Sequence, residues 1–371
     1  MDSFEPRRRR RARRVPRDKF AALKAFFDSS NMFHYEGLLG NGGQGSIYKI
    51  KYVELNKPNP LSRRLVAKVA DPSRGSDVEG VAREKMILET LRYCQHIVSM
   101  IDSPDDPLAS AQRLGWAWIF LEEMENGTLN AFLKRARVAG FVSLPNRMLW
   151  RIFLCMIRAC IDMAWPPSSS DSDEKTIQFL DKPTGLVHND IHGGNFMFGS
   201  LADDPEHAIS PILKLLDFGL AQRINSSDFA SVATGEQQNI EDIGIMMATI
   251  LTLQTDWKYT GEDVQVDLSR LGYSSAVLSP ASGILGGPEH DEPDPLPYID
   301  RDMRLIIAAC MASNPQDRPM MVDLERWVYS EVSNTQPAYY GINRGGAEWE
   351  SNETICNIVQ QCIFDALEDV T

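Results

Sequence analysis

The chain has 371 residues, of which 43% are hydrophobic and 24% charged, and its formal net charge at pH 7 is −13. These values are typical of a folded globular protein, and the length suits a domain with two lobes and extra segments rather than one small core. No apolar run approaches the ~20 residues that a membrane-spanning helix needs. No apolar segment of the secretory type follows the basic N-terminus. We therefore expect an intracellular protein, cytoplasmic or nuclear, without a membrane partner.

The six cysteines are scattered along the sequence, with no Cys-x-x-Cys pair and no histidine at ligand spacing. This pattern favours reduced thiols in a cytosolic or nuclear setting. It argues against a disulfide framework and against a zinc site.

Basic residues gather at the N-terminus, where residues 1–19 hold nine of the 38 Lys and Arg together with three acids. We expect residues 1–30 to form a disordered basic arm. Its 7–19 run is of the kind that contacts nucleic acid or serves nuclear import, and a solvated tail without a partner is an equally good reading. Because the remainder is acidic, nucleic acid is not expected as the main ligand of the folded part.

The elements expected after the arm follow the order strand, strand, strand, helix, strand, strand, and the chain then turns mostly helical. Strands are predicted at 35–40, 46–55, 61–70, 96–101 and 115–121, with an amphipathic helix at 78–93. Later helices are predicted at 128–137, 145–165, 239–254, 302–313, 319–332 and 353–367, the last of them packing on its own domain. The polar segment 166–183 reads as a flexible insertion.

A glycine-rich turn joins the first two strands, with Gly40, Gly42 and Gly45 in a G-x-G-x-x-G pattern. Positions without side chains let backbone amides approach nucleotide phosphates, and the branched residue Ile47 could cover an adenine ring. Glycine turns between strands are common, so this pattern alone is weak. Its place before a strand rather than a helix disfavours a dinucleotide fingerprint.

Two acids and an amide stand in the segments His188–Asn195 and Leu215–Gly219. Asp190 precedes Asn195 by five residues, and Asp217 opens an Asp-Phe-Gly turn after an apolar strand. A carboxylate that orients a hydroxyl, together with oxygen ligands for metal ions, is what phosphoryl transfer from a Mg-nucleotide requires. We expect His188 to support the loop, and neither His188 nor His192 to bind a metal.

These segments together resemble the eukaryotic protein kinases over roughly residues 35–332. The late stretch Leu305–Pro319 resembles their C-lobe signature, which small-molecule kinases of the aminoglycoside-phosphotransferase type lack. The resemblance implies an α+β, bilobal fold with a five-stranded antiparallel N-lobe sheet plus one helix and a mainly helical C-lobe. The implied domains are an N-lobe at 31–124, a C-lobe at 125–335 and a C-terminal extension at 336–371.

The resemblance also implies roles for individual residues. Lys68 would pair with the ATP phosphates and be held by an acid of the following helix, for which Glu84 is our choice, with Glu79 and Glu89 as rivals. Asp190 would be the catalytic carboxylate, and Asn195 and Asp217 would hold Mg. The implied adenine-binding segment, residues 120–129, would use Leu121 and the backbone of Glu122 and Met124.

Several positions depart from the family pattern. Asn189 replaces the loop arginine that pairs with an activation-loop phosphate, so we expect no need for such a phosphate. His192 replaces a lysine that reaches the γ-phosphate in serine/threonine kinases. The segment from Asp217 to Asn239 is short and lacks Ala-Pro-Glu, and Asn239 replaces an anchoring aspartate. Glu236 is the acid expected to pair with Arg318.

Three functions compete on this basis. The first is a serine/threonine protein kinase that transfers the γ-phosphate of Mg-ATP to a hydroxyl, and the full set of catalytic residues favours it. The second is a small-molecule kinase, favoured by His192 and the short segment. The third is a nucleotide-binding pseudokinase scaffold, favoured by the shortened segment and opposed by the intact metal-binding acids.

Overall fold

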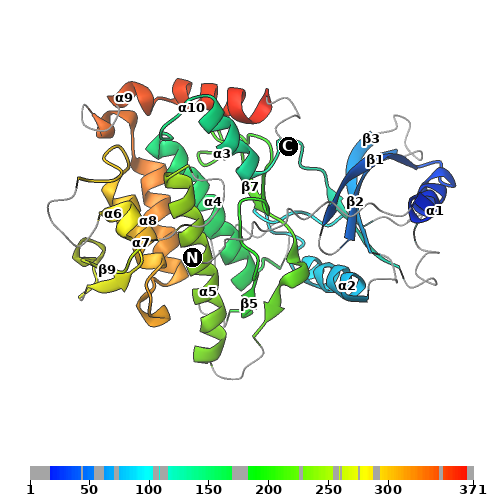
Figure 1. The fold of residues 1–371 in the computed structure, drawn as a ribbon, viewed down its shortest axis with the longest axis horizontal. Coiled ribbons are helices and arrows are strands. Elements are labelled where there is room, and N and C mark those ends of the chain that lie inside the picture. The colour runs from blue at the N-terminus through cyan, green and yellow to red at the C-terminus, as the bar shows by residue number, and fades with distance from the viewer. Residues whose placement is uncertain are drawn as a thin grey trace, which may run out of the picture. The chain divides into compact units, whose positions relative to one another are not determined.

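The structure is a computed structural model that describes residues 17–42, 45–53, 62–70, 75–102, 108, 116–168, 183–224, 229–253, 259, 261–274, 276–286, 293–341 and 346–365. It divides into two compact units (Figure 1). The first unit comprises Met1–Glu89 with Met100–Glu123, and the second comprises Thr90–Ser99 with Met124–Thr371. The basic run at 7–16, the insertion residues 169–182 and the end of the last predicted helix lie outside the described residues.

The first unit is built on a four-stranded antiparallel sheet. Its strands are β1 (Phe33–Gly42), β2 (Gly45–Val53), β3 (Ser62–Ala70) and β4 (Ala117–Glu122), which are neighbours in that order. Helix α2 (Gly75–Thr90) follows β3. These elements agree with the predicted order strand, strand, strand, helix, strand.

The fifth strand that we expected at 96–101 is reduced to two isolated bridges, one between Ile97 and Leu215 and one between Met100 and Leu121. The reason lies in the hydrogen bonds of the preceding residues. The carbonyl of His96 accepts from the Leu215 amide at 2.8 Å, and the Val98 amide donates to the Leu215 carbonyl at 3.0 Å. Because these backbone groups pair within the second unit, they do not extend the sheet of the first.

One face of the sheet is apolar and is covered by helix α1 (Arg17–Asp28). Across three strands, Tyr48 and Phe120 both stand opposite Ala67, so their side chains share that face. Leu23 and Phe27 lie one helical turn apart in α1 and are 1% and 0% exposed. Burying a side chain of this size contributes about 1.5–3 kcal/mol. This burial corrects our expectation that the chain is disordered up to residue 30.

The second unit is mainly helical. Its longer helices are α3 (Leu129–Val138), α4 (Asn146–Ala164), α5 (Phe229–Leu251), α7 (Arg301–Cys310), α8 (Met321–Asn334) and α10 (Asn352–Val359). Short elements complete it: β5 (Leu186–Val187) with β8 (Gln222–Arg223), β6 (Phe196–Phe198) with β7 (Leu213–Leu215), β9 (Val264–Val266) with β10 (Val277–Ser279), α6 (Ser282–Leu285) and α9 (Gly346–Trp349). Single helical turns occur at Phe218–Leu220, Ser269–Leu271, Pro315–Asp317, Pro337–Tyr340 and Gln360–Phe364.

Helix α4 is the centre of the second unit, because every one of its residues is buried. It packs against α5 and α8, and α5 packs in turn against α7 (Figure 1). The α10 face that we predicted is also buried, through Ile355, Ile358 and Val359. The C-terminal extension therefore belongs to the core of this unit.

Helix α5 begins at Phe229 rather than near Asn239, where we expected it. Gly235 shows why this stretch of helix can pack closely. A Cβ at position 235 would lie 3.0 Å from Val187 Cγ2 and 3.1 Å from the Gly185 carbonyl oxygen. A larger residue at position 235 would therefore crowd β5, and the glycine lets the helix pack closely against it.

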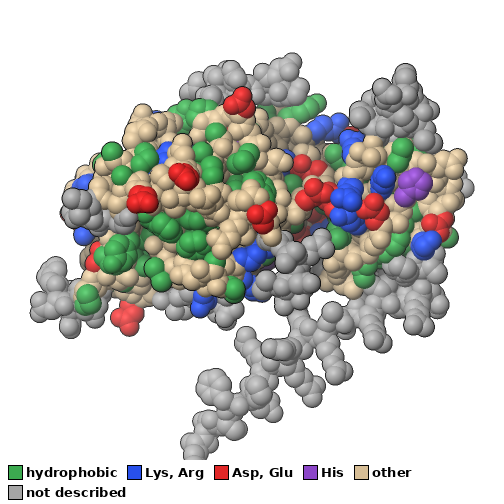
Figure 2. Space-filling view, turned by 90° about the horizontal axis from the view of Figure 1, so that it is seen from above, with side chains coloured by type: hydrophobic (Ala, Val, Ile, Leu, Met, Phe, Trp, Pro, Cys, Tyr) green, Lys and Arg blue, Asp and Glu red, His purple; other side chains and the backbone are tan. Residues whose placement is uncertain are grey.

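Charged side chains of both signs are interspersed on the face drawn in Figure 2, where the coloured Lys and Arg do not gather into one basic patch. In the part of the chain that the structure describes, no helix is both long and apolar enough to cross a membrane.

Candidate active site

Lys68 and Glu84 form a buried ion pair in the first unit. Lys68 Nζ lies 2.6 Å from Glu84 Oε2, and their side chains are 5% and 1% exposed. Of the three acids that the sequence left open, Glu84 is the partner, whereas Glu79 and Glu89 are exposed on α2. A buried pair of this kind fixes the position of the ammonium group, which suits it to hold phosphate oxygens.

The sheet places Lys68 among apolar neighbours on the face opposite to α1. Ile47 of β2 and Ile119 of β4 both stand directly across from Lys68, so all three side chains share one face. Leu121 lies two residues after Ile119 on the same face and is 6% exposed. An ammonium group bordered by aliphatic side chains offers what a nucleotide needs, which is charge for phosphates and an apolar surface for a base.

The glycine-rich turn separates into two kinds of position. At Gly40 a Cβ would meet nothing within 4 Å, so this glycine leaves open space above the strand. Gly45 has a φ of 146°, and a Cβ there would lie 2.8 Å from the Val69 carbonyl oxygen. Gly45 is thus required for the close pairing of β2 with β3. Gly42 pairs with Gly45 at the end of the hairpin, and residues 43 and 44 lie outside the described part.

The adenine-binding segment predicted at 120–129 runs from β4 to the first residue of α3. Glu122 ends β4, and the division between the two units falls between Glu123 and Met124. Thr128 caps α3, because its hydroxyl accepts from the Ala131 amide at 3.2 Å. Thr128 is therefore the N-cap residue of α3. Contact of Leu121, Glu122 and Met124 with adenine stays a prediction.

In the second unit, His188 supports the loop that carries Asp190. The His188 side chain is fully buried, its Nε2 lies 3.0 Å from the Leu216 carbonyl oxygen, and its Nδ1 accepts from the Asp190 amide at 3.3 Å. Its ring also packs edge-on against Phe218, with ring centroids 4.8 Å apart. His188 therefore links the residue before Asp217 to the backbone of Asp190, which is a structural role.

Asn239 of α5 anchors the same loop from the other side. Its Oδ1 accepts from the His188 amide at 3.1 Å, and its Nδ2 donates to the Leu186 carbonyl at 2.8 Å. An aspartate at this position could accept the first bond but could not donate the second. The amide thus satisfies two buried backbone groups of opposite polarity.

Asp190 is held by the amide of Asn195. Nδ2 of Asn195 donates to the Asp190 carboxylate at 3.1 Å and to the Asp190 carbonyl at 2.9 Å. His192 lies next to the other carboxylate oxygen of Asp190, with its Nε2 3.6 Å from Asp190 Oδ1. The Asp190 side chain remains 37% exposed. A positioned and accessible carboxylate can accept or orient the proton of a hydroxyl group.

Asn195 and Asp217 lie together at the end of the β6–β7 hairpin, because the Leu216 amide donates to the Asn195 carbonyl at 2.8 Å. Since the amide nitrogen of Asn195 faces Asp190, its oxygen is the atom that could ligate a metal. A carboxylate and an amide oxygen form a hard donor set that fits Mg²⁺. These residues are therefore chemically suited to the metal ions that we predicted for them.

Asn189 and Asp217 both adopt left-handed backbone conformations, with φ of 62° and 65°. Such conformations cost about 1–3 kcal/mol for a residue other than glycine and gather at functional sites. The Asn189 side chain donates to the Leu220 carbonyl at 3.1 Å. Where the resemblance to protein kinases would place an arginine, this chain has an amide that is bonded to the residue just after the Asp-Phe-Gly turn.

Arg318 does not pair with Glu236, so that expectation is wrong. Arg318 Nη2 lies 3.0 Å from Glu241 Oε2, while Glu236 accepts from the Met321 amide at 3.2 Å. The early start of α5 explains why Glu241 takes the place of Glu236 as the partner of Arg318. It places Glu236 inside the helix, facing the first turn of α8. Burial raises the pKa of Glu236, and the Met321 amide opposes that rise.

Comparison with known proteins agrees with this geometry. Residues 33–259, more than half of the chain, match the family model described as protein tyrosine and serine/threonine kinase. With the antiparallel sheet and the helical second unit, this match shows that the chain belongs to that family.

One curated relative shares most of the chain. The serine/threonine-protein kinase atg1 of Schizosaccharomyces pombe is 23% identical over 337 residues, which cover 80% of this chain and 35% of that protein. The chain therefore spans just over a third of the length of this relative.

Proposed function

We propose that the chain is an active serine/threonine-type protein kinase that transfers the γ-phosphate of Mg-ATP to a hydroxyl group. The observation that carries this proposal is the hydrogen bond between Asn195 and the Asp190 carboxylate, next to Asp217 on the same hairpin. A scaffold that only binds nucleotide has no need to position an accessible acid. The match to a serine/threonine kinase supports the choice of acceptor.

Each residue has a separate task in this proposal. Asp190 accepts or orients the proton of the acceptor hydroxyl. Lys68, positioned by Glu84, holds the α and β phosphates. Gly40, Gly42 and Gly45 allow the backbone to cover the phosphates, while Ile47, Leu121 and the backbone of Glu122 and Met124 bind the adenine. Asn195 and Asp217 would hold Mg²⁺, which when bound neutralises the charge of the phosphate oxygens.

A small-molecule hydroxyl is the second candidate acceptor. His192 lies 3.6 Å from the Asp190 carboxylate, at the position where serine/threonine kinases place a lysine. The early start of α5 also shortens the segment on which protein kinases present a peptide. Both features reduce what the chain offers to a peptide and leave the phosphate chemistry intact.

An assay with radiolabelled ATP tests the acceptor. Wild type and Asp190→Ala are each incubated with Mg-ATP and with mixed Ser, Thr and Tyr peptides, and in parallel with a metabolite pool. We expect label on Ser and Thr peptides with wild type only. Label on metabolites alone would replace the protein acceptor by a small molecule. Absence of label, with Mg-dependent ATP binding retained, would leave a pseudokinase.

A further inference from the structure

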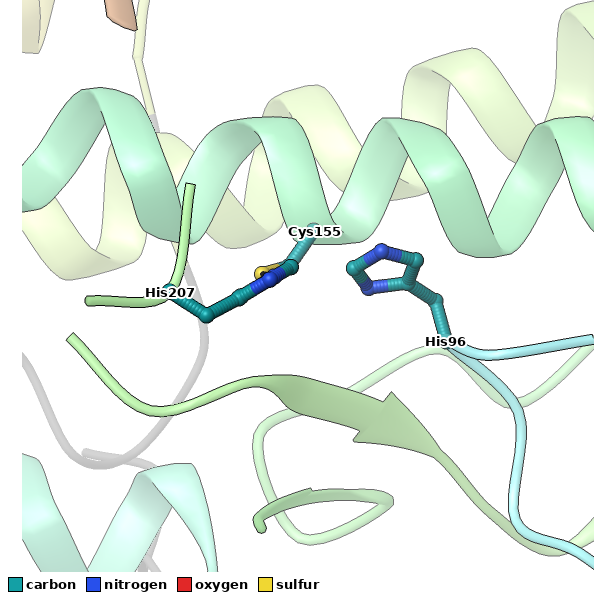
Figure 3. Close-up of side chains that lie close together, drawn as sticks. All are labelled: His96, Cys155 and His207. Carbon is teal, nitrogen blue, oxygen red and sulfur yellow. Dashed lines mark hydrogen bonds between the residues drawn. The ribbon is translucent and has the colours of Figure 1, made fainter. Parts of the chain in front are cut away.

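Three side chains that can bind a transition metal meet in the interior of the second unit (Figure 3). They are His96 from the segment that follows α2, Cys155 from α4, and His207 from the loop between β6 and β7. Their ligand atoms all lie within 4.8 Å of one another, and the residues are 1%, 4% and 5% exposed. The three residues are far apart in the sequence, which is why their spacing suggested no zinc site.

The two imidazoles are oriented in the same way as metal-bound histidines. His207 Nδ1 lies 3.1 Å from both carboxylate oxygens of Asp204, and His96 Nδ1 lies 3.3 Å from the Leu213 carbonyl oxygen. An acceptor at Nδ1 keeps the proton there and leaves the lone pair on Nε2. A carboxylate or carbonyl behind each ring is the usual support of a histidine ligand.

The distance between thiol and imidazole suits a shared metal. Cys155 Sγ lies 3.6 Å from His207 Nε2. Zn–N and Zn–S bonds of about 2.1 and 2.3 Å at a tetrahedral angle separate the two ligand atoms by about 3.6 Å. A hydrogen bond between Cys155 and His207 would explain the same distance. It would not explain why the imidazole of His96 lies beside this pair, with its ring centroid 5.3 Å from that of His207.

The charges around the cluster permit a cation. Besides His207, which is itself part of the cluster, Arg158 and Lys214 are the positive groups that act on His96. Arg158 is balanced by two acids, with its Nη2 3.4 Å from Glu206 Oε1 and 3.1 Å from Glu325 Oε1. Asp204 adds a negative charge behind His207.

A nucleophilic cysteine is the other chemistry that a Cys–His pair can support, and it fits this site poorly. Burial raises the pKa of the Cys155 thiol to about 12, although the Leu213 backbone opposes that rise. A reactive cysteine needs a lowered pKa and access to a substrate. With its residue only 4% exposed, Cys155 has neither.

We propose that His96, Cys155 and His207 bind one Zn²⁺ as a structural site that joins α4, the β6–β7 loop and the His96 segment. Two imidazoles and one thiolate are a ligand set that favours zinc over Mg²⁺ or Ca²⁺. As the S–Zn bond forms, the thiol proton of Cys155 passes to solvent, and no oxidant or reductant is needed. The fourth position takes a water molecule or a carboxylate of the loop, in which Glu206 adjoins His207.

The test is the zinc content of the untagged full chain after loading with Zn²⁺ and dialysis against a weak chelator. We expect one zinc per chain in wild type and none in Cys155→Ala. Cys160→Ala is the matched control, because Cys160 is a buried thiol of the same helix outside the cluster. It should retain one zinc. With Co²⁺ as the probe, a thiolate charge-transfer band should appear in wild type and Cys160→Ala alone.

Asp204→Asn keeps the proposal falsifiable if Cys155→Ala does not fold. The asparagine oxygen can still accept the Glu206 and His207 amides, both 2.8 Å from Asp204 Oδ1, so the loop keeps these backbone hydrogen bonds. The negative charge behind His207 is lost, and an NH2 group replaces one of the two acceptor oxygens that face His207 Nδ1. We expect zinc affinity to fall about 10–100-fold. Wild type without zinc, or zinc affinity unchanged in both Cys155→Ala and Asp204→Asn, would overturn the proposal.

Discussion

Asn239 shows how one substitution can preserve the geometry of a kinase loop with different chemistry. Its carboxamide accepts from the His188 amide and donates to the Leu186 carbonyl, so both backbone groups on the approach to Asp190 are satisfied. Each of these residues is buried. The loop therefore depends on an amide where a carboxylate would leave the Leu186 carbonyl without a donor.

This arrangement predicts that Asn239→Asp is not a neutral return to the family residue. The carboxylate keeps the bond to His188, loses the donor to Leu186 and buries a charge. We expect the free energy of unfolding to fall by about 1–3 kcal/mol, as measured by urea denaturation at pH 7.5. Asn239→Ala should lose both bonds and be at least as destabilised. Equal stability of Asn239→Asp and wild type would show that the Leu186 bond is unimportant.

Asn189 predicts activity without phosphorylation of the activation segment. An amide bonded to the Leu220 carbonyl cannot form the charge-assisted pair by which a loop arginine binds a phosphate. Replacing every Ser and Thr from 226 to 234 by Ala should leave the rate of phosphate transfer at the wild-type level. Loss of activity in that variant, with an unchanged circular dichroism spectrum, would contradict this reading of Asn189.

At the scale of elements, the C-terminal extension completes the first turn of α4. Pro145 precedes that helix and supplies no side-chain cap. Instead, the buried Glu350 carboxylate accepts from the Asn146 amide at 2.8 Å and from the Arg147 amide at 2.9 Å. A negative charge at this end also suits the helix dipole. The central helix of the second unit thus depends on a residue near the end of the chain.

Glu350→Ala should therefore be strongly destabilising. It leaves the backbone amides of Asn146 and Arg147 without an acceptor and removes the negative charge that favours the Arg147 guanidinium. Each buried amide without a partner costs about 1–3 kcal/mol. Glu348→Ala is the control, because Glu348 is exposed two residues earlier. Thermal unfolding of both variants measures the difference. Similar melting temperatures for the two variants would contradict the capping role.

Helix α5 carries a partly buried acid, Asp242, whose charge should affect the stability of the fold. Burial raises the pKa of Asp242 to about 6 and Glu241 adds to the rise, while Gln238 and Arg318 oppose it. Since the pKa in the folded state lies above the unfolded value of 3.8, the folded chain binds more protons between these two values. Stability from this group is present below pH 4 and is lost as the pH rises through 6.

Asp242→Asn should accordingly be more stable than wild type at pH 7.5, by about 1–3 kcal/mol. The advantage should disappear below pH 4, where both chains carry an uncharged side chain at this position. Urea denaturation of the two proteins at each pH measures the difference, so that effects of other acids cancel. A difference that does not change with pH would refute the titration of Asp242.

At the scale of the whole molecule, the sequence predicted what local periodicity and motif spacing determine. Alternating and helical apolar patterns located β1 to β4, α2 and the helices of the second unit. The motif spacing singled out the hydrogen-bonded Asp190 and Asn195. The resemblance to protein kinases favoured Glu84 over Glu79 and Glu89 as the partner of Lys68, and Glu84 forms that ion pair.

What the sequence did not predict depends on packing between distant segments. Helix α1 exists because Leu23 and Phe27 find an apolar sheet face, and the expected fifth strand pairs with β7 instead. The partner of Arg318 was misjudged because the start of α5 was placed too late. His96, Cys155 and His207 come from three elements, so only the folded chain brings them together.

The most direct test of the central claim is the rate of phosphate transfer from Mg-ATP by wild type and by Asp190→Ala at saturating nucleotide. If Asp190 is the catalytic carboxylate, wild type turns over. The variant should then be about 10²–10⁴-fold slower, with ATP affinity unchanged because Asp190 acts on the acceptor. Equal rates in the two proteins, or no transfer by wild type with any hydroxyl acceptor, would contradict the account.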